Sequence, residues 1–357
     1  MSETTQVYTA TKEYVKIIGR THYYNDALWL ALSGSGVEFS FFGTKAHVTI
    51  KGDQIAQGET NLARIAIEVN GKRVVDEQID QPLRSYTVFE SETEQQVTVK
   101  IIKLSEAAMS TVGIQEIIVD AAEGIRPASP NVHTIEFIGD SITCGYGVDD
   151  EVALHPFSTG TEDVTKAYAY LTAQALQADY SMVSYSGYGI ISGYTDNDQK
   201  LLTHLIPDYY EKVAKSEGRL DGTLDPLTLS WDFSAFTPEL IVVNLGTNDD
   251  SYTKDFADLQ ADYAEQYTEF LKMVRKNNPE AQILCTLGIM GDRLFPFVEQ
   301  AVVRYMQETG DTRIATMKFD VQLEEDGYAA DFHPSQVTHK KAAHKLTAYI
   351  RELMGWN

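Results

Sequence analysis

Beyond residue 130 the chain alternates between short apolar runs and longer helix-like segments, and this alternation limits its fold more than any other feature. The apolar runs cover residues 134–138, 181–185, 240–245, 283–287 and 314–319. Helices are predicted between and after them, over residues 165–178, 200–214, 256–276, 295–309 and 336–353. Strands that alternate with helices indicate a parallel sheet covered by helices. The pattern therefore predicts a three-layer α/β domain over residues 131–357.

The first third of the chain follows a different period. Polar and apolar residues alternate in four segments, over residues 36–41, 48–50, 65–69 and 97–101. This period of two is typical of half-buried antiparallel strands, and Asn70-Gly71 is a strong signal for a tight hairpin. Helical periodicity of useful length is missing before about residue 120. An all-β sandwich or jelly-roll domain is predicted over residues 1–125, followed by a linker within residues 121–130 that contains Gly124, Pro127 and Pro130.

The charge balance excludes some classes of partner. The 357 residues include 52 acidic and 29 basic side chains, which gives a formal net charge of −23. Such a surface repels phosphates and anionic lipids, so neither nucleic acid nor membrane is an expected partner. No apolar run approaches the roughly 20 residues of a membrane span, and residues 1–10 lack the features of a signal peptide. A cytoplasmic location is expected, or a secreted one if a leader has been removed.

Only two cysteines occur, Cys144 and Cys285. Two thiols cannot build a disulfide framework, and on their own they cannot form a zinc site. Both lie in or after apolar runs, so buried and unreactive thiols are expected.

The segment Gly139-Asp140-Ser141 directly follows the first apolar run of the α/β domain. It places a serine hydroxyl at the carboxyl edge of the predicted sheet, where open α/β folds carry their chemistry. Thr143 lies two residues after the serine, so this is not the Gly-x-Ser-x-Gly turn of α/β-hydrolases. A serine needs a base to become a nucleophile, and His333, just before the last helix, is expected at the same edge. Asp331 is the candidate that orients the histidine ring.

An acyl-transfer site also needs donors for the oxyanion that forms during the reaction. Three candidates follow predicted strands: the backbone N–H groups of Ser141 and Gly187, and the side-chain amide of Asn248. Asp140 is expected to accept N–H groups of the turn rather than to act as a catalytic acid.

These segments together resemble the SGNH (GDSL-type) hydrolase superfamily, which is named for its Ser, Gly, Asn and His site residues. The four matching blocks occur in family order: Gly139-Asp140-Ser141, Ser186-Gly187, Gly246-Thr247-Asn248-Asp249 and His333-Pro334. The resemblance implies a flavodoxin-like parallel sheet and ester hydrolysis. One departure matters, because the superfamily usually places its aspartate three residues before the histidine, where this chain has Ala330. Either the Asp331 side chain or a backbone carbonyl could therefore hold His333.

Further features resemble carbohydrate esterase family 2. They are the β-rich first domain, the extended block over residues 139–147, Phe157-Ser158 with Thr161-Glu162-Asp163, and His333-Pro334-Ser335 followed by Thr338-His339. Members of that family remove acetyl groups from plant polysaccharides and oligosaccharides, xylan among them. The resemblance therefore implies an acetyl xylan esterase-like enzyme that acts on acetylated xylo-oligosaccharides or similar carbohydrates.

In this interpretation Ser141 attacks an acetyl carbonyl, His333 takes its proton, and no metal or organic cofactor is required. Phe332 and Tyr188 are expected to form an apolar wall against the acetyl methyl group or a sugar face. The first domain is expected to help shape the cleft rather than to bind carbohydrate. Two alternatives stay open: an esterase of lipid or thioester substrates, and a non-catalytic glycan-binding protein. The oligomeric state is not predicted.

Overall fold

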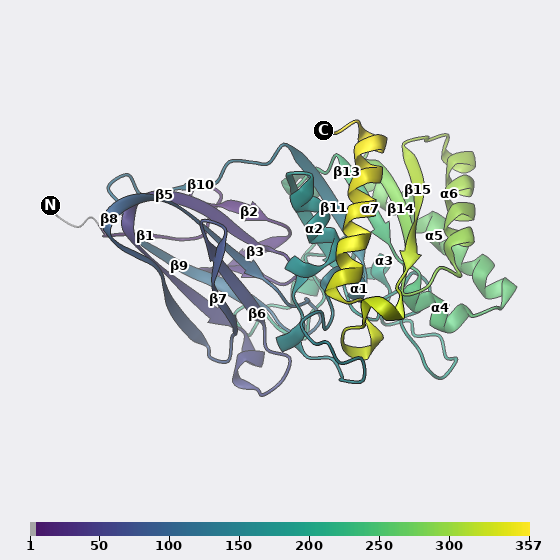
Figure 1. Ribbon diagram of the computed structural model, residues 1–357, viewed down its shortest axis with the longest axis horizontal. Helices are drawn as coiled ribbons and strands as arrows, with labels where there is room; N and C mark the ends of the chain where they lie inside the picture. The colour runs from purple at the N-terminus through teal and green to yellow at the C-terminus, as the bar shows by residue number, and fades with distance from the viewer. Residues whose placement is uncertain (1–4) are drawn as a thin grey trace. The chain divides into compact units, whose positions relative to one another are not determined.

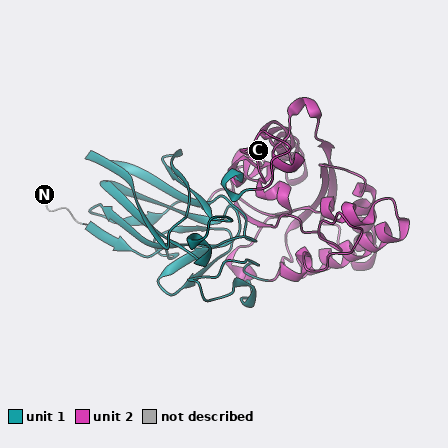
Figure 2. Ribbon diagram, turned by 90° about the horizontal axis from the view of Figure 1, so that it is seen from below, with its two compact units in different colours: residues 1–130, 158–162, 212–231 teal, residues 131–157, 163–211, 232–357 magenta. Residues whose placement is uncertain are grey.

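The computed structural model describes residues 5–357 and divides into two compact units (Figure 2). The first, here called the β unit, comprises residues 1–130, 158–162 and 212–231. The second, the α/β unit, comprises residues 131–157, 163–211 and 232–357. The units are interleaved along the chain. The consecutive domains predicted from sequence, 1–125 and 131–357, do not include the two segments that the later part of the chain contributes to the β unit.

The β unit is a curled antiparallel sheet organised around two long strands, β5 (Gly36–Gly52) and β8 (Leu83–Lys103). The main path of the sheet runs β3 (Thr21–Tyr24), β4 (Ala27–Leu30), β9 (Val112–Asp120), β5, β8, β6 (Arg64–Val69) and β7 (Lys72–Gln78). In addition, β1 (Thr5–Tyr8) pairs with β9, and β2 (Lys16–Ile18) and β10 (Ile125–Pro127) pair with β5.

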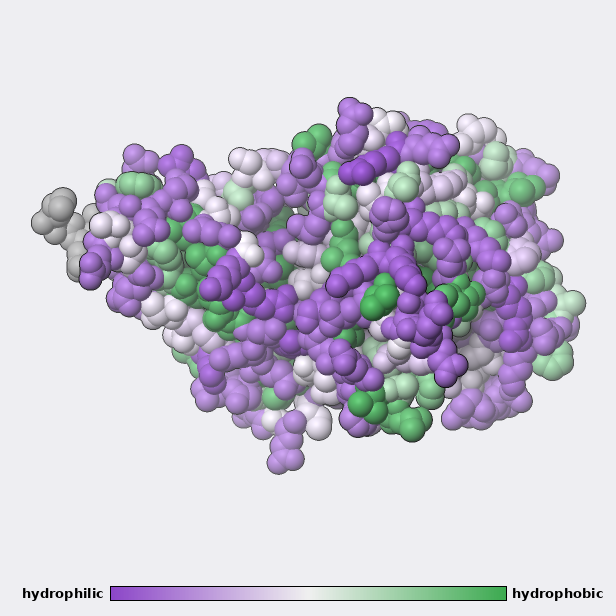
Figure 3. All heavy atoms as spheres, viewed as in Figure 1, coloured by the Kyte–Doolittle hydropathy of each residue, from purple (hydrophilic) through white to green (hydrophobic). Residues whose placement is uncertain are grey.

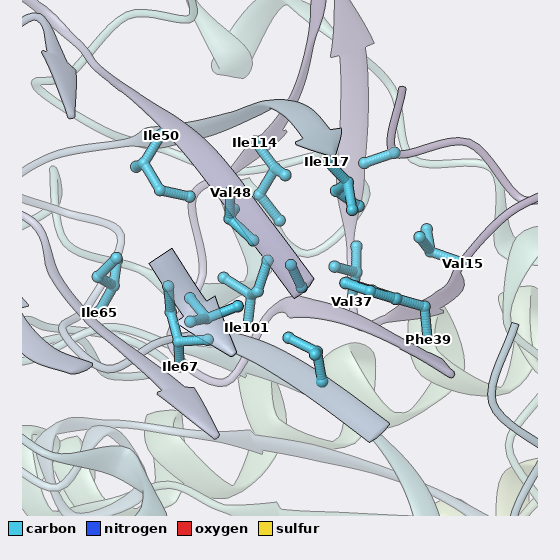
Figure 4. Close-up of a cluster of buried hydrophobic side chains, with 14 of the residues drawn as sticks. Val15, Val37, Phe39, Val48, Ile50, Ile65, Ile67, Ile101, Ile114 and Ile117 are labelled. Carbon is cyan, nitrogen blue, oxygen red and sulfur yellow. The ribbon is translucent and has the colours of Figure 1, made fainter. Parts of the chain in front are cut away.

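Alternate residues of these strands build the core of the β unit. Val37, Phe39, Val48 and Ile50 of β5 are buried together with Ile101 of β8 (Figure 4). Successive strand residues point to opposite faces, so a period-two sequence places its apolar side chains on one side of the sheet. This confirms the all-β domain predicted from the alternation. The hairpin at Asn70-Gly71 is also confirmed, since β6 and β7 pair with Val69 opposite Lys72.

The predicted linker is wrong in part. Residues Ile125–Pro127 form strand β10, which pairs antiparallel with residues 39–41 of β5. Ile125 is buried, and this burial keeps the segment on the sheet despite its glycine and prolines. Pro127 takes the last position of the strand, and as the final residue of an edge strand it tolerates the loss of an N–H donor.

The α/β unit contains one parallel sheet with the order β12 (Ala178–Ser184), β11 (His133–Gly139), β13 (Leu240–Asn244), β14 (Gln282–Ile289) and β15 (Ile314–Val321). In chain order this reads second, first, third, fourth, fifth, which is the flavodoxin-like arrangement. The chain leaves β11 toward one edge and returns to β13 on the other side. The loops after β11 and β13 therefore diverge, which opens a site at the carboxyl ends of these strands.

Helices cover the parallel sheet in two pairs. α2 (Tyr168–Ala175) packs against α7 (Gln336–Met354), and α5 (Ala257–Asn277) packs against α6 (Phe295–Thr309) (Figure 1). Right-handed crossovers in opposite directions from β11 place the two pairs on opposite faces. The short helices α1 (Ser141–Cys144), α3 (Ile206–Tyr209) and α4 (Thr247–Thr253) follow loops at the sheet edge. The three-layer α/β fold is confirmed.

The helix predicted over residues 200–214 is wrong. Only Ile206–Tyr209 is helical. Leu201 and Leu205 instead form isolated β-bridges with Gly193 and Gly189, so their backbone groups pair with the loop that follows β12. Apolar spacing in this segment reflects packing of an irregular loop rather than one face of a helix.

Both cysteines are free and buried, as predicted. The Cys144 thiol donates to Ser184 Oγ at 3.2 Å, and burial raises the pKa of Cys285 to about 12. A buried thiol that stays protonated is unreactive.

On the face drawn in Figure 3, hydrophilic residues predominate and apolar residues form small separate patches. Over residues 5–357, none of the helices combines the length and the apolar character that crossing a bilayer requires.

Candidate active site

Ser141 is the first residue of α1, and only Asp140 separates it from the end of β11. Asp140 caps this helix, because its carboxylate accepts the Ile142 N–H at 3.0 Å. The predicted structural role of Asp140 is confirmed by this contact. Burial raises the pKa of Asp140 to about 7, and the neighbouring charge of Asp249 adds to the shift. Ser141 itself is 5% exposed, so its hydroxyl lies in a fixed and largely dry position.

His333 contacts Ser141 although it lies near the C-terminal end of the chain. It follows a single 3-10 turn, Ala330–Phe332, and precedes α7. The distance between His333 Nε2 and Ser141 Oγ is 2.9 Å, although 192 positions separate the two residues in the chain. A parallel sheet makes this approach possible, because the loops after β11 and β15 leave the same edge.

The backbone carbonyl of Asp331, rather than its side chain, contacts the His333 ring. The distance from His333 Nδ1 to this carbonyl oxygen is 3.2 Å. The Asp331 carboxylate instead accepts the Tyr146 hydroxyl at 2.6 Å and the Phe157 N–H at 3.1 Å. Of the two arrangements left open by the sequence, the structure has the one with a carbonyl. The side-chain contact predicted for Asp331 is absent from the described contacts of His333.

An unusual backbone conformation explains this orientation. Asp331 and Phe332 have φ values of 50° and 58°, in the left-handed region that non-glycine residues rarely adopt. Two consecutive residues of this kind cost about 1–2 kcal/mol each. Their N–H groups donate to the carbonyls of His155 and Ala153 at 3.1 and 3.2 Å, which holds the turn in place. Strain of this kind is typical of functional sites.

The protonation state of His333 follows from its surroundings. Burial lowers the pKa of this histidine to about 4, while the hydrogen bond to the Asp331 carbonyl opposes the shift. The ring is therefore neutral at pH 7. A carbonyl can only accept a hydrogen bond, so the single ring hydrogen is assigned to Nδ1. Nε2 then carries the lone pair that accepts the Ser141 hydroxyl.

Two glycines after β12 have separate roles. Gly187 has φ +81°, and among the described residues no atom comes within 4 Å of a Cβ built on it. A Cβ on Gly189 would lie 2.2 Å from the Ser192 carbonyl oxygen and 2.6 Å from Asp249 Oδ2. Gly189 is thus required for packing, whereas Gly187 faces open space.

Asn248 lies in the first turn of α4, after β13, and is nearly buried. Its side-chain nitrogen donates to the Tyr188 carbonyl at 2.8 Å and lies 3.4 Å from Asp140 Oδ2. The amide therefore connects the loops that follow three strands: β11, β12 and β13. Its second N–H, directed at Asp140, makes only a long contact.

Asp249 holds the loop after β12, a role that the sequence interpretation missed. Its buried carboxylate accepts the N–H groups of Ile190, Ile191 and Ser192 over distances of 2.7 to 3.2 Å. Burial raises its pKa to about 6 even though these bonds favour the charged form. The sequence feature that could have indicated this role is the position of Asp249 next to Asn248 in the Gly-Thr-Asn-Asp block.

The two aromatic residues predicted to line the site differ in exposure. Phe332 is 50% exposed and can contact a ligand. Tyr188 is 1% exposed and packs against Tyr185, His204 and Tyr209, so its ring has no surface to offer a substrate. The contribution of Tyr188 is its carbonyl, which accepts from Asn248.

Among the described residues, no group of three or more His, Cys, Asp or Glu side chains is arranged to hold a metal ion.

A flavodoxin-like sheet with a serine and a neutral histidine in contact at its carboxyl edge defines an α/β serine hydrolase of the ester-cleaving class. Residues 137–341 match the profile of the GDSL-like Lipase/Acylhydrolase family, and residues 17–129 match that of the Carbohydrate esterase 2 N-terminal domain. The chain belongs to the GDSL-like lipase/acylhydrolase family, with the two-domain organisation of the family 2 carbohydrate esterases. The resemblance found in the sequence is confirmed.

Several known proteins are similar over most of this chain. Cellulase/esterase CelE of Acetivibrio thermocellus is 31% identical over 330 residues, which cover 91% of this chain and 38% of that protein. A family two carbohydrate esterase from Clostridium thermocellum, solved in complex with cellohexaose, is 28% identical with a TM-score of 0.80, over 96% of this chain and 100% of that one. An acetyl xylan esterase from the rumen bacterium Butyrivibrio proteoclasticus is 25% identical with a TM-score of 0.87, over 99% of both chains.

Proposed function

We propose that this protein removes O-acetyl groups from carbohydrates through an acyl-enzyme on Ser141. The observation that carries the proposal is the 2.9 Å contact between Ser141 Oγ and His333 Nε2 in a fold shared with carbohydrate esterases. A neutral histidine in hydrogen-bond contact with a serine is the arrangement that activates a hydroxyl for attack on an ester.

In the proposed reaction, Ser141 Oγ bonds to the carbonyl carbon of the acetyl group while its proton passes to His333 Nε2. The tetrahedral oxyanion accepts from the N–H groups of Ser141 and Gly187 and from the Asn248 amide, which turns its second N–H from Asp140 to the substrate. The bond between the acetyl carbonyl carbon and the sugar oxygen then breaks, and His333 gives its proton to that oxygen, which leaves as a hydroxyl group. Water then attacks the acyl-enzyme and gives a proton to His333, and the bond from Ser141 Oγ to the acyl carbon breaks. Acetate leaves, and His333 returns the proton to Ser141 Oγ.

The substrate class is proposed as acetylated oligosaccharides of the xylan type. Half-exposed Phe332, one residue before His333, offers an apolar face of the kind that packs against sugar rings. The structurally similar esterase solved with cellohexaose, and the acetyl xylan esterase, support a carbohydrate ligand at this scaffold. The chain spans only 38% of cellulase/esterase CelE, so no further activity of that protein is assigned to it.

Acetate release from acetylated xylo-oligosaccharides tests the proposal, with a long-chain acyl ester as the comparison substrate. Release from the sugars with little action on the long chain is expected. Turnover of the long chain alone would retain the serine chemistry and replace the carbohydrate substrate by a lipid. Inactivity on both, combined with binding of the oligosaccharide, would instead indicate a glycan-binding protein.

The pH dependence should reflect the lowered pKa of the partly buried His333. His333 must be neutral to take the serine proton, and its pKa lies at about 4 rather than at the usual 6.5. We therefore expect kcat/KM to fall at acid pH with a midpoint near pH 4. Around pH 6.5, kcat/KM should not change with pH. Intrinsic fluorescence over the same range identifies any acid unfolding. A midpoint near 6.5 in the folded protein would mean that the site does not desolvate this ring.

Asp331→Asn should reduce kcat/KM by about tenfold or less, because the backbone carbonyl remains to hold His333 Nδ1. In hydrolases whose aspartate contacts the histidine directly, the same change costs about 10⁴-fold. Steady-state kinetics at pH 7 distinguish the two cases. A loss close to 10⁴-fold would mean that the carboxylate contacts the ring in the working enzyme.

A further inference from the structure

The segment Gly145-Tyr146-Gly147 lies directly after α1 and has no part in the reaction steps described above. Gly145 and Gly147 both have positive φ, at +80° and +59°. A Cβ on Gly145 would lie 2.6 Å from the Asp163 carbonyl oxygen, and one on Gly147 would lie 2.7 Å from the Cβ of Ala330. Both positions therefore require glycine, and the backbone on either side of Tyr146 is fixed by close packing.

The ring of Tyr146 lies against the imidazole of His333. The two ring centroids are 3.8 Å apart, and the planes are inclined by 21°. Phe157 stacks on the other face of the Tyr146 ring, with the two ring centroids 4.5 Å apart and the planes inclined by 30°. Three rings are thus stacked in the order Phe157, Tyr146, His333.

The hydroxyl of Tyr146 is fixed by the same residue that holds His333. It donates to Asp331 Oδ2 at 2.6 Å, and the Phe157 N–H donates to that oxygen at 3.1 Å. Asp331 in turn offers its carbonyl to His333 Nδ1. Tyr146, Asp331 and His333 therefore form a closed set of contacts, in which the stacked ring is held at its backbone, at its hydroxyl and on its far face.

We propose that Tyr146 is a positioning residue for His333, whose ring fixes the plane of the imidazole and whose π face stabilises the imidazolium formed when Ser141 gives up its proton. This inference rests on the proposed esterase function. A single carbonyl contact at Nδ1 leaves the imidazole free to tilt about that bond, and a stacked aromatic ring removes this freedom. The face of a phenol ring attracts a cation, and in a desolvated site the effect corresponds to about a 30-fold change in rate.

Three variants separate positioning from folding. Tyr146→Leu removes the stacked ring and should lower kcat by about 30-fold with KM changed by less than about twofold. Tyr146→Phe keeps the ring and should recover most of that loss. Tyr349→Leu is the matched control, since Tyr349 is also half-buried with a hydrogen-bonded hydroxyl, donated to the Thr316 carbonyl. Tyr349→Leu should lose thermal stability to an extent similar to Tyr146→Leu, while kcat of its folded fraction stays unchanged.

A series of phenylalanines with increasing ring fluorination, placed at position 146, tests the stabilisation of the cation at nearly constant shape. Fluorine withdraws electron density from the π face, so kcat and the acid-limb midpoint of kcat/KM should fall step by step along the series. A flat series, or a Tyr146→Leu variant with wild-type kcat, would overturn the proposal. If Ser141→Ala keeps full turnover, the esterase mechanism itself fails, and this result is independent of the outcome at Tyr146.

Discussion

Ser141→Ala should abolish acetate release, with a fall in kcat of about 10⁴-fold or more. Within the turn that carries Ser141, the described side chains offer no group that can replace the lost hydroxyl. In the same turn, the Thr143 hydroxyl pairs with that of Tyr168 at 2.9 Å, and the Cys144 thiol donates to Ser184. Both groups are buried and directed into the packing of the α/β unit. What remains after the substitution is binding and the oxyanion donors, which alone give only weak catalysis.

The measurement is acetate release at saturating substrate, alongside thermal unfolding of the same preparation. The folding of Ser141→Ala should match wild type, because the Asp140 carboxylate still caps α1 through the Ile142 N–H. Ser234→Ala, an exposed serine in a 3-10 turn, serves as the matched control and should keep full activity. Turnover that survives in a folded Ser141→Ala variant would remove this residue from the mechanism.

Asn248→Ala should lower kcat by about 10²- to 10³-fold with a small change in KM, because its amide donates most strongly to the oxyanion. The same substitution leaves the buried Tyr188 carbonyl without the donor that lies at 2.8 Å. An unpaired buried acceptor costs about 1–3 kcal/mol of stability. The expected result is therefore a loss of activity together with a lower unfolding temperature.

Asn278→Ala separates these two effects. Asn278 is also buried, and its side-chain nitrogen donates to the Tyr210 hydroxyl at 2.8 Å and to the Val274 carbonyl at 3.1 Å. Its replacement should lower the unfolding temperature to a similar extent and leave kcat of the folded protein unchanged. If the two variants lost activity equally, Asn248 would be a structural residue and the oxyanion would rest on backbone N–H groups alone.

The sequence predicts the sheet and the meeting of Ser141 with His333 because both follow from regular features. Apolar runs locate the strands, and the carboxyl ends of parallel strands share one edge. Residues 134–138 and 314–319, taken as strands from their composition, lie within β11 and β15. The loops after these two strands carry the serine and the histidine.

The remaining features depend on backbone conformation and tertiary packing, which local patterns do not encode. The left-handed turn at Asp331 and Phe332 decides that a carbonyl, not a carboxylate, faces His333. Tyr188 looks like a cleft residue from its neighbours in the chain, yet the loop turns its ring into the interior. Leu201 and Leu205 are spaced as on one face of a helix, yet each forms an isolated β-bridge with the loop after β12. In each case a residue's environment is set by segments distant in sequence.

The interleaving of the two units has a consequence for biosynthesis. Within the β unit, Arg20 lies 5.2 Å over the ring of Trp231 and donates to the Lys212 carbonyl at 2.8 Å, and the Glu106 N–H donates to Glu162 at 2.8 Å. An N-terminal domain emerging from the ribosome cannot complete these contacts until residue 231 has been synthesised. By then β11 and β12 of the other unit have also been synthesised. The β unit therefore cannot be complete before part of the α/β unit has been synthesised, and neither unit can be exchanged between proteins as one uninterrupted cassette.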